Sequence, residues 1–198
     1  MKTAVLVDGA FFIKRYKYLV DSNLDAEKVA RAVSATAWKL MRKCNKHSHK
    51  HRSLYRIFFY DCPSIKYYAG PHPVTGEPYK VEEKSDYKFR DDLHKSLVKL
   101  RKVALRMGEL HAKNGKWAVS SEGIKKLKQG KTLQELAEKD VYYEMKQAGV
   151  DMRIGLDIAS LSSAGNVDQI ILIAGDSDFV PAAKMARRYG IDFVLDPE

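Results

Sequence analysis

Short, largely apolar runs recur along the chain and predict buried β-strands. They cover Thr3–Val7, Leu54–Tyr60 and Ile170–Ala174, and each is followed by a turn residue or an acid. An apolar run that no polar residue interrupts is typical of a strand buried on both faces of a parallel sheet. Ile191–Leu195 is expected to add a last strand.

Apolar residues at three- and four-residue spacing predict helices between these strands. One helix is expected from Ala26 to about Cys44, with Asp25 as its N-cap. A second is expected near Asp151, and a third from about Phe179 to Tyr189, ended by a left-handed glycine at Gly190.

The chain from residue 64 to about 130 loses this regular alternation and predicts an insertion. The segment is basic and aromatic and is broken by prolines and glycines. Local patterns favour a helix over Asp86–Met107, a short strand over Lys116–Val119, helical turns over Glu122–Gln129 and, after the insertion, a helix over Thr132–Gln147. The insertion could be a substrate-facing arm or an ordinary solvated subdomain, because its aromatic residues can stack on bases or simply pack.

This order of elements predicts one α/β domain over residues 1–198, with the insertion at 64–130 inside it. A mostly parallel sheet with helices on both faces and right-handed crossovers is the arrangement that such an order favours. The sequence stops soon after the last predicted strand, so a helix covering one face could be missing or be replaced by a second copy of the chain. A homodimer is therefore one possible assembly.

The charge balance favours a polyanionic partner. The 198 residues include 35 Lys and Arg against 25 Asp and Glu, giving a formal net charge of +10 and a pI near 9.4. Nucleic acid or an anionic membrane surface would attract such a protein. Lysine-rich solvated helices explain the same composition without a binding role, so charge alone does not decide the question.

Other composition features point to a reducing, cytoplasmic setting and to no membrane association. The chain has two cysteines, Cys44 and Cys62, no secretory signal pattern, and no apolar run long enough to span a bilayer. His47, His49 and His51 alternate in a basic stretch whose spacing fits no tetrahedral zinc template, so we interpret the stretch as a basic loop.

Acids follow the two strands expected at the centre of the sheet. Asp8 follows the first strand, and Asp176 and Asp178 follow Ile170–Ala174. Ligands of open α/β sheets bind beyond the carboxyl ends of the strands, so these acids are expected to converge there if the two strands are neighbours. Asp151 and Asp157, at the start of a helix, are expected to join them.

Carboxylates that gather at one edge repel one another unless their pKa values rise or a cation binds. Oxygen ligands without histidine or cysteine select Mg²⁺ or Mn²⁺, which can activate a water for attack on a phosphate ester. The alternative is structural, since aspartate is also a common turn and N-cap residue where a strand passes into a helix.

Three segments resemble the NYN domain family of PIN-like nucleases, which includes the LabA-like proteins. They are TAVLVDGAFF, AGVDMRIGLDIASLS and IILIAGDSDFVPAAKMARRYG. The resemblance implies a PIN-like three-layer α/β/α sandwich, with a mostly parallel central sheet, and the activity of a metal-dependent endoribonuclease on RNA. It also implies five catalytic acids, namely Asp8, Asp151, Asp157, Asp176 and Asp178.

Within this resemblance, Asp8, Asp157 and Asp176 are the expected Mg²⁺ or Mn²⁺ ligands, directly or through water. Asp178 would support them or hold a second ion, and Asp151 would orient the attacking water or cap its helix. Four basic residues are expected to contact the RNA backbone: Lys14, Arg15, Lys17 and Lys184.

Two alternatives remain open at this stage. Many NYN proteins carry a polar asparagine shortly after the first Asp-Gly, where this chain has Ala10-Phe11-Phe12, so a non-catalytic RNA-binding or assembly module is the main rival. A phosphatase of the haloacid dehalogenase type fits less well. Its nucleophile strand usually ends in Asp-x-Asp, whereas Ala10 stands two residues after Asp8, and Val180 stands where its metal loop would need a further acid.

Overall fold

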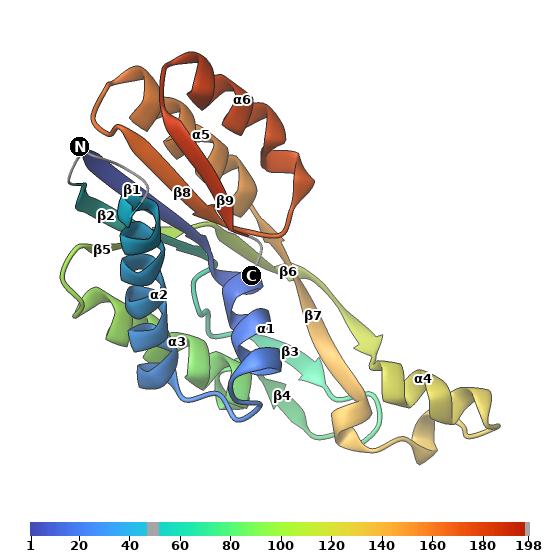
Figure 1. The fold of residues 1–198 in the computed structure, drawn as a ribbon. Helices are drawn as coiled ribbons and strands as arrows, with labels where there is room; N and C mark the ends of the chain where they lie inside the picture. The colour runs from blue at the N-terminus through green and yellow to red at the C-terminus, as the bar shows by residue number, and fades with distance from the viewer. Residues whose placement is uncertain (47–51, 197–198) are drawn as a thin grey trace.

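The computed structural model describes residues 1–46 and 52–196, with backbone only at 45 and 46, and shows a three-layer α/β/α sandwich (Figure 1). Its central sheet has the strand order β5-β2-β1-β8-β9, and every neighbouring pair is parallel. This confirms the predicted fold class and the pairing of the first strand with the Ile170–Ala174 run. The strands are β1 (Lys2–Asp8), β2 (Ser53–Asp61), β5 (Val103–Met107), β8 (Gln169–Ile173) and β9 (Asp192–Asp196).

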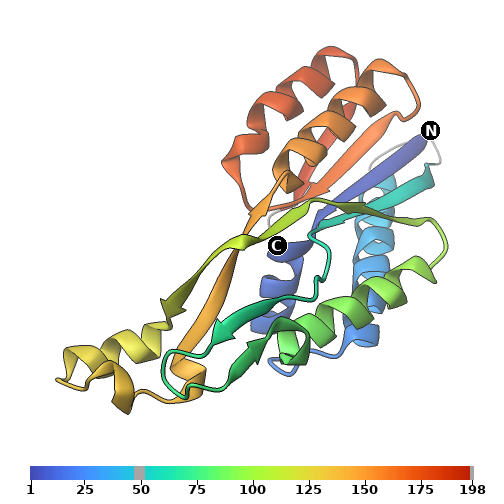
Figure 2. The ribbon, with the colours of Figure 1, turned by 180° about the vertical axis from the view of Figure 1, so that it is seen from behind.

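Helices cover both faces of this sheet (Figures 1 and 2). Side chains alternate along a strand, so Val5 and Val7 of β1 enter one buried cluster and Ala4 and Leu6 enter the other. The first cluster is covered by α1 (Gly9–Leu19), α2 (Ala26–Lys46) and α3 (Ser85–Val98). The second is covered by α5 (Val150–Ser163) and α6 (Val180–Arg188).

Two antiparallel pairs lie outside the central sheet. A small hairpin joins β3 (Tyr68–Pro71) to β4 (Pro78–Lys80), and a longer arm pairs β6 (Glu109–Val119) with β7 (Val141–Ala148). Figure 2 shows the arm leaving the sheet, with α4 (Ser121–Lys128) near its far end. Single helical turns complete the chain: η1 (Val81–Glu83), η2 (Leu133–Glu135), η3 (Glu138–Asp140) and η4 (Ser177–Phe179).

One predicted helix is too long and another is wrong. The helix predicted over Asp86–Met107 ends at Val98, and Val103–Met107 instead forms edge strand β5 beside β2. The helix predicted over Thr132–Gln147 is replaced by η2, η3 and strand β7, and the short strand at Lys116–Val119 is the end of the longer β6. In both places another strand supplies backbone hydrogen-bond partners. These tertiary contacts override the helical spacing of the local sequence.

The range 64–130 therefore divides into parts with different positions. The β3–β4 hairpin lies outside the central sheet, whereas α3 packs on one face of that sheet and β5 extends it. The arm begins inside this range and returns through β7 at residue 148. The inserted material is thus interleaved with core elements of the sandwich.

Helix α1 directly follows β1, where the sequence predicts only a turn. Its first residue, Gly9, is needed because a Cβ there would lie 2.5 Å from the carbonyl oxygen of Tyr60 on β2. Two other local predictions are confirmed. Asp25 caps α2 by accepting from the Lys28 amide at 2.8 Å, and Gly190 ends α6 with φ at 79°.

Candidate functional site

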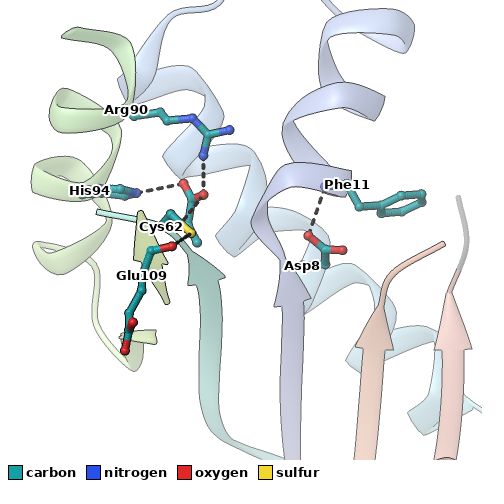
Figure 3. A network of polar contacts seen from close by, with 7 residues as sticks. Asp8, Phe11, Cys62, Arg90, His94 and Glu109 are labelled. Atoms are coloured by element: carbon teal, nitrogen blue, oxygen red, sulfur yellow. Dashed lines mark hydrogen bonds and ion pairs between the residues drawn. The ribbon is translucent and has the colours of Figure 1, made fainter. Parts of the chain in front are cut away.

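Two acids follow neighbouring strands at the carboxyl edge of the sheet, because β1 pairs with β8. Asp8 ends β1, and its Oδ1 accepts from the amide of Phe11 at 3.1 Å, which caps α1 (Figure 3). β8 ends beside it, with Ile173 opposite Val7 in the register. Asp176 follows β8, and its Oδ1 accepts from the amide of Asp178 at 2.9 Å. Asp8 and Asp176 therefore also cap helical turns, which is a common structural role of aspartate where a strand passes into a helix.

Asp151, in the first turn of α5, interacts electrostatically with these acids. Burial raises the pKa of Asp8, and the negative charges of Asp151 and Asp61 raise it further, although the amides of Phe11 and Ala10 oppose them. Burial also raises the pKa of Asp151, and repulsion from Asp176 and Asp178 adds to it. We refer to Asp8, Asp151, Asp176 and Asp178 as the acidic edge.

Asp157 has different partners. Its Oδ2 accepts from the hydroxyl of Tyr60 at 2.7 Å and from Nε of Arg106 at 2.9 Å. Six residues along an α-helix turn a side chain by about 120° relative to Asp151, so the two acids face different directions from α5. Asp157 is directed at β2 and β5, where Tyr60 and Arg106 lie, and not to the side of α5 that carries Asp151.

The acidic edge does not form a closed metal cage. Across residues 1–46 and 52–196, no three His, Cys, Asp or Glu side chains converge closely enough to hold one metal ion. Mg²⁺, however, usually keeps several waters and binds one or two carboxylates together with substrate phosphates. The residues fit that mode, because they offer only oxygen donors and a cation would relieve the repulsion that raises the pKa values of Asp8 and Asp151.

Asp61, at the end of β2, is a further acid that the sequence analysis leaves out of the site. It is buried, and it binds Arg90 and His94 of α3 as well as the amide of Cys62 (Figure 3). Burial raises its pKa, but the His94 hydrogen bond and the Arg90 charge outweigh that effect and lower it. Its signal in the sequence is the one used for Asp8, an acid directly after a buried apolar strand.

Phe11, three residues after Asp8, has a clear structural role. Gly175 precedes Asp176, and a Cβ at Gly175 would lie 2.5 Å from the ring of Phe11. The ring therefore packs directly on the backbone that leads to Asp176. Phe11 thus forms an apolar contact between α1 and the loop after β8.

The basic residues expected to hold RNA lie on the helices beside the edge. Lys14 and Lys17 of α1 and Lys184 of α6 are exposed. Arg15 lines a groove of about 520 Å³ between α1 and α2, together with Lys28 and other residues. Its Nε is buried and has no hydrogen-bond partner among the residues that the structure describes. His47, His49 and His51 lie outside those residues.

The sequence profile of the NYN domain family matches residues 2–196. A crystal structure of a protein of unknown function from Vibrio parahaemolyticus aligns with 98% of this chain and 79% of its own, at 13% identity and a TM-score of 0.44. No curated protein matches the sequence significantly. None of the helices in the described part of the chain is long and apolar enough to cross a membrane.

Proposed function

Because the chain belongs to the NYN domain family, we propose that it is a metal-dependent ribonuclease that hydrolyses RNA phosphodiester bonds at the acidic edge. The observation that carries this proposal is the electrostatic coupling of Asp151 with Asp8, Asp176 and Asp178. The pKa values of Asp8 and Asp151 are raised by burial and by neighbouring carboxylates beside the carboxyl ends of β1 and β8, and such an environment favours a divalent cation.

Mg²⁺ or Mn²⁺ at this edge would supply Lewis acidity and a more acidic bound water. In our proposal Asp8 and Asp176 are the direct carboxylate ligands, because each is held in place by the backbone amide that it caps. Asp178 would help to hold the ion through a water molecule. Asp151 accepts a hydrogen bond from the attacking water and orients it, since its exposed carboxylate stands in the first turn of α5.

Asp157 is a positioning residue in this proposal. Its bonds to Tyr60 and Arg106 tie the middle of α5 to β2 and β5. Because Asp151 lies on the same helix, this anchor fixes where its carboxylate meets the edge.

Arg15 and the lysines near the edge hold the RNA backbone. Arg15 lines the groove between α1 and α2, where its guanidinium would donate to a phosphate oxygen. Lys14, Lys17 and Lys184 add charge from exposed positions on α1 and α6. Binding of this kind weakens steeply as the salt concentration rises.

A cleavage assay tests the proposal. Labelled single-stranded and structured RNAs are incubated with the wild type and with Asp8→Asn and Asp176→Asn, in Mn²⁺, in Mg²⁺ and in EDTA. We expect cleavage by the wild type in either metal, none in EDTA, and a loss of about 100-fold or more in both variants, as for removal of a charge-stabilising group from an active site. Asp91→Asn, which changes an exposed acid on α3, is the matched control and should cleave normally.

A non-catalytic RNA-binding module is the second candidate, and the apolar Ala10-Phe11-Phe12, where many NYN proteins carry a polar asparagine, favours it. Asp176→Asn separates the two functions. The nuclease should lose cleavage and keep its affinity for RNA, whereas a binder should show no wild-type cleavage and bind RNA equally or more tightly after the change. Metal-independent cleavage that survives in both variants would rule out the proposed site.

A further inference from the structure

A pocket of about 250 Å³ lies beside the carboxyl end of β2, between the β3–β4 hairpin, α3 and the β6–β7 arm. Cys62 lines it and directly follows Asp61, while β2 is the sheet neighbour of β1, which ends at Asp8. The pocket is therefore a near neighbour of the acidic edge. Its volume is just below the roughly 300–1,000 Å³ of pockets for drug-sized ligands, so it suits a smaller planar group.

Its walls combine aromatic rings with hydrogen-bonding groups. Tyrosines line it from three elements, with Tyr79 on β4, Tyr87 on α3, and Tyr142 and Tyr143 on β7. Polar groups between them come from Lys84, Asp86, Arg90 and Gln147. Aromatic faces with a few donors and acceptors are the combination that binds unstacked bases of single-stranded RNA.

One wall of the pocket is braced by an aromatic cluster. Trp117 of β6 contacts Tyr143 with ring centroids 5.4 Å apart and Tyr79 at 5.0 Å, and Tyr67 stacks on Tyr143 at 5.9 Å. The hydroxyl of Tyr143 donates to the carbonyl of Ala112 at 2.9 Å. These contacts join the hairpin to the arm, so Tyr79 and Tyr143 are structural parts of the wall.

Tyr87 and Tyr142 stand outside this cluster. In the described chain neither ring stacks on another aromatic side chain, and Tyr142 is 43% exposed. A ligand can therefore contact either ring without breaking an aromatic stack. Arg90 connects the pocket to the site, because it lines the pocket, remains 27% exposed and contacts Asp61 at the end of β2.

We propose that this pocket binds one unstacked base of the RNA substrate, next to the phosphodiester held at the acidic edge. The inference rests on the proposed function, and it adds a base-recognition subsite formed by α3 and the arm. A base between Tyr87 and Tyr142 would place its own backbone beside Arg90 and the end of β2. The subsite would then set the register of the RNA relative to Asp8.

The test measures RNA binding in EDTA, so it does not depend on cleavage. The affinity for a fluorescent single-stranded RNA is measured by anisotropy for the wild type, Tyr142→Ala, Tyr87→Ala and Tyr142→Phe. A matched oligonucleotide with abasic positions keeps the phosphates and removes the bases. Tyr189→Ala, at an exposed tyrosine that follows α6, is the control, and thermal melting of each variant verifies folding.

We expect each alanine variant to weaken binding of the base-containing RNA by about tenfold, the effect of losing one base–aromatic stack, while abasic RNA changes less than twofold. Tyr142→Phe and Tyr189→Ala should bind like the wild type. Equal loss on both oligonucleotides, or no loss in either folded alanine variant, would overturn the pocket proposal. Failure of the nuclease proposal is detected separately, as absence of wild-type cleavage in Mn²⁺.

Discussion

Tyr60 of β2 donates its hydroxyl hydrogen to Oδ2 of Asp157 on α5 at 2.7 Å. Tyr60 also lies opposite Asp8 in the register of β1 and β2, so this bond fastens α5 to the strand beside the first acid of the edge. Arg106 of β5 completes the contact and places its guanidinium 4.8 Å from the Phe58 ring centroid. An acid that the family resemblance assigns to the metal thus stabilises the position of the helix that carries Asp151.

Tyr60→Phe tests this anchor. The change removes a buried hydrogen bond to a carboxylate and should lower the free energy of unfolding by about 1.5–3 kcal/mol, the range for hydrogen bonds to charged groups. Urea denaturation gives the value. Tyr55→Phe on the same strand is the control and should change stability little, and a Tyr60→Phe protein as stable as the wild type would contradict the anchoring role.

Asp151→Asn should stabilise the metal-free protein at neutral pH. Burial and the charges of Asp176 and Asp178 raise the pKa of Asp151, so its ionisation destabilises the folded state as the pH rises above the ordinary value of 3.8. The gain should be about 0.5 kcal/mol, the size of an exposed charge pair, and should vanish below that pH. Melting curves in EDTA at several pH values measure it. A gain that stays constant down to acidic pH would exclude charge repulsion as its cause.

Asp61→Ala should destabilise the protein by about 3 kcal/mol, because it leaves Arg90 and His94 without their buried partner. The folded pKa of Asp61 is lowered, so its contribution is present above 3.8 and is lost as the pH falls through the folded pKa. Denaturant titrations between neutral and acidic pH measure this loss. Asp91→Asn, which removes only a surface pair with Lys95, should change stability by less than about 1 kcal/mol.

Mn²⁺ should raise the melting temperature through the acidic edge. A ligand at 100 times its dissociation constant stabilises the folded state by about 2.7 kcal/mol, or roughly 5–10 °C for a chain of this size. Asp8→Asn and Asp176→Asn should reduce this shift, whereas Asp91→Asn should retain it. An equal shift in all four proteins would place the bound ion elsewhere.

Gly175→Ala should disturb the loop that carries Asp176. The added Cβ would lie 2.5 Å from the Phe11 ring, and overpacking of this kind costs about 1–3 kcal/mol. Combining it with Phe11→Leu should recover part of the lost stability and of the Mn²⁺ shift, because the smaller side chain makes room. A double variant that shows simple additivity would argue against direct contact between the two residues.

Local sequence patterns were sufficient to predict the central part of the fold. Ala4–Val7 of β1 and the whole of β8 are buried, and β2 is buried from Ile57 onward, so the apolar pattern alone predicts strands of a parallel sheet. Asp25 and Gly190 act through bonds and backbone angles within a few residues, which is why their capping roles could also be predicted.

Tertiary structure decided the features that depend on distant partners. Val103–Met107 and Val141–Ala148 become strands because β2 and β6 offer them backbone partners, and helical spacing carries no information about such partners. Asp8 and Asp176 could be placed at one edge from the sequence, because both follow strands of a parallel sheet. Only the packing of α5 directed Asp157 to Tyr60 and Arg106. A carboxylate's chemistry is fixed by its residue type, whereas its partners are fixed by the elements that fold around it.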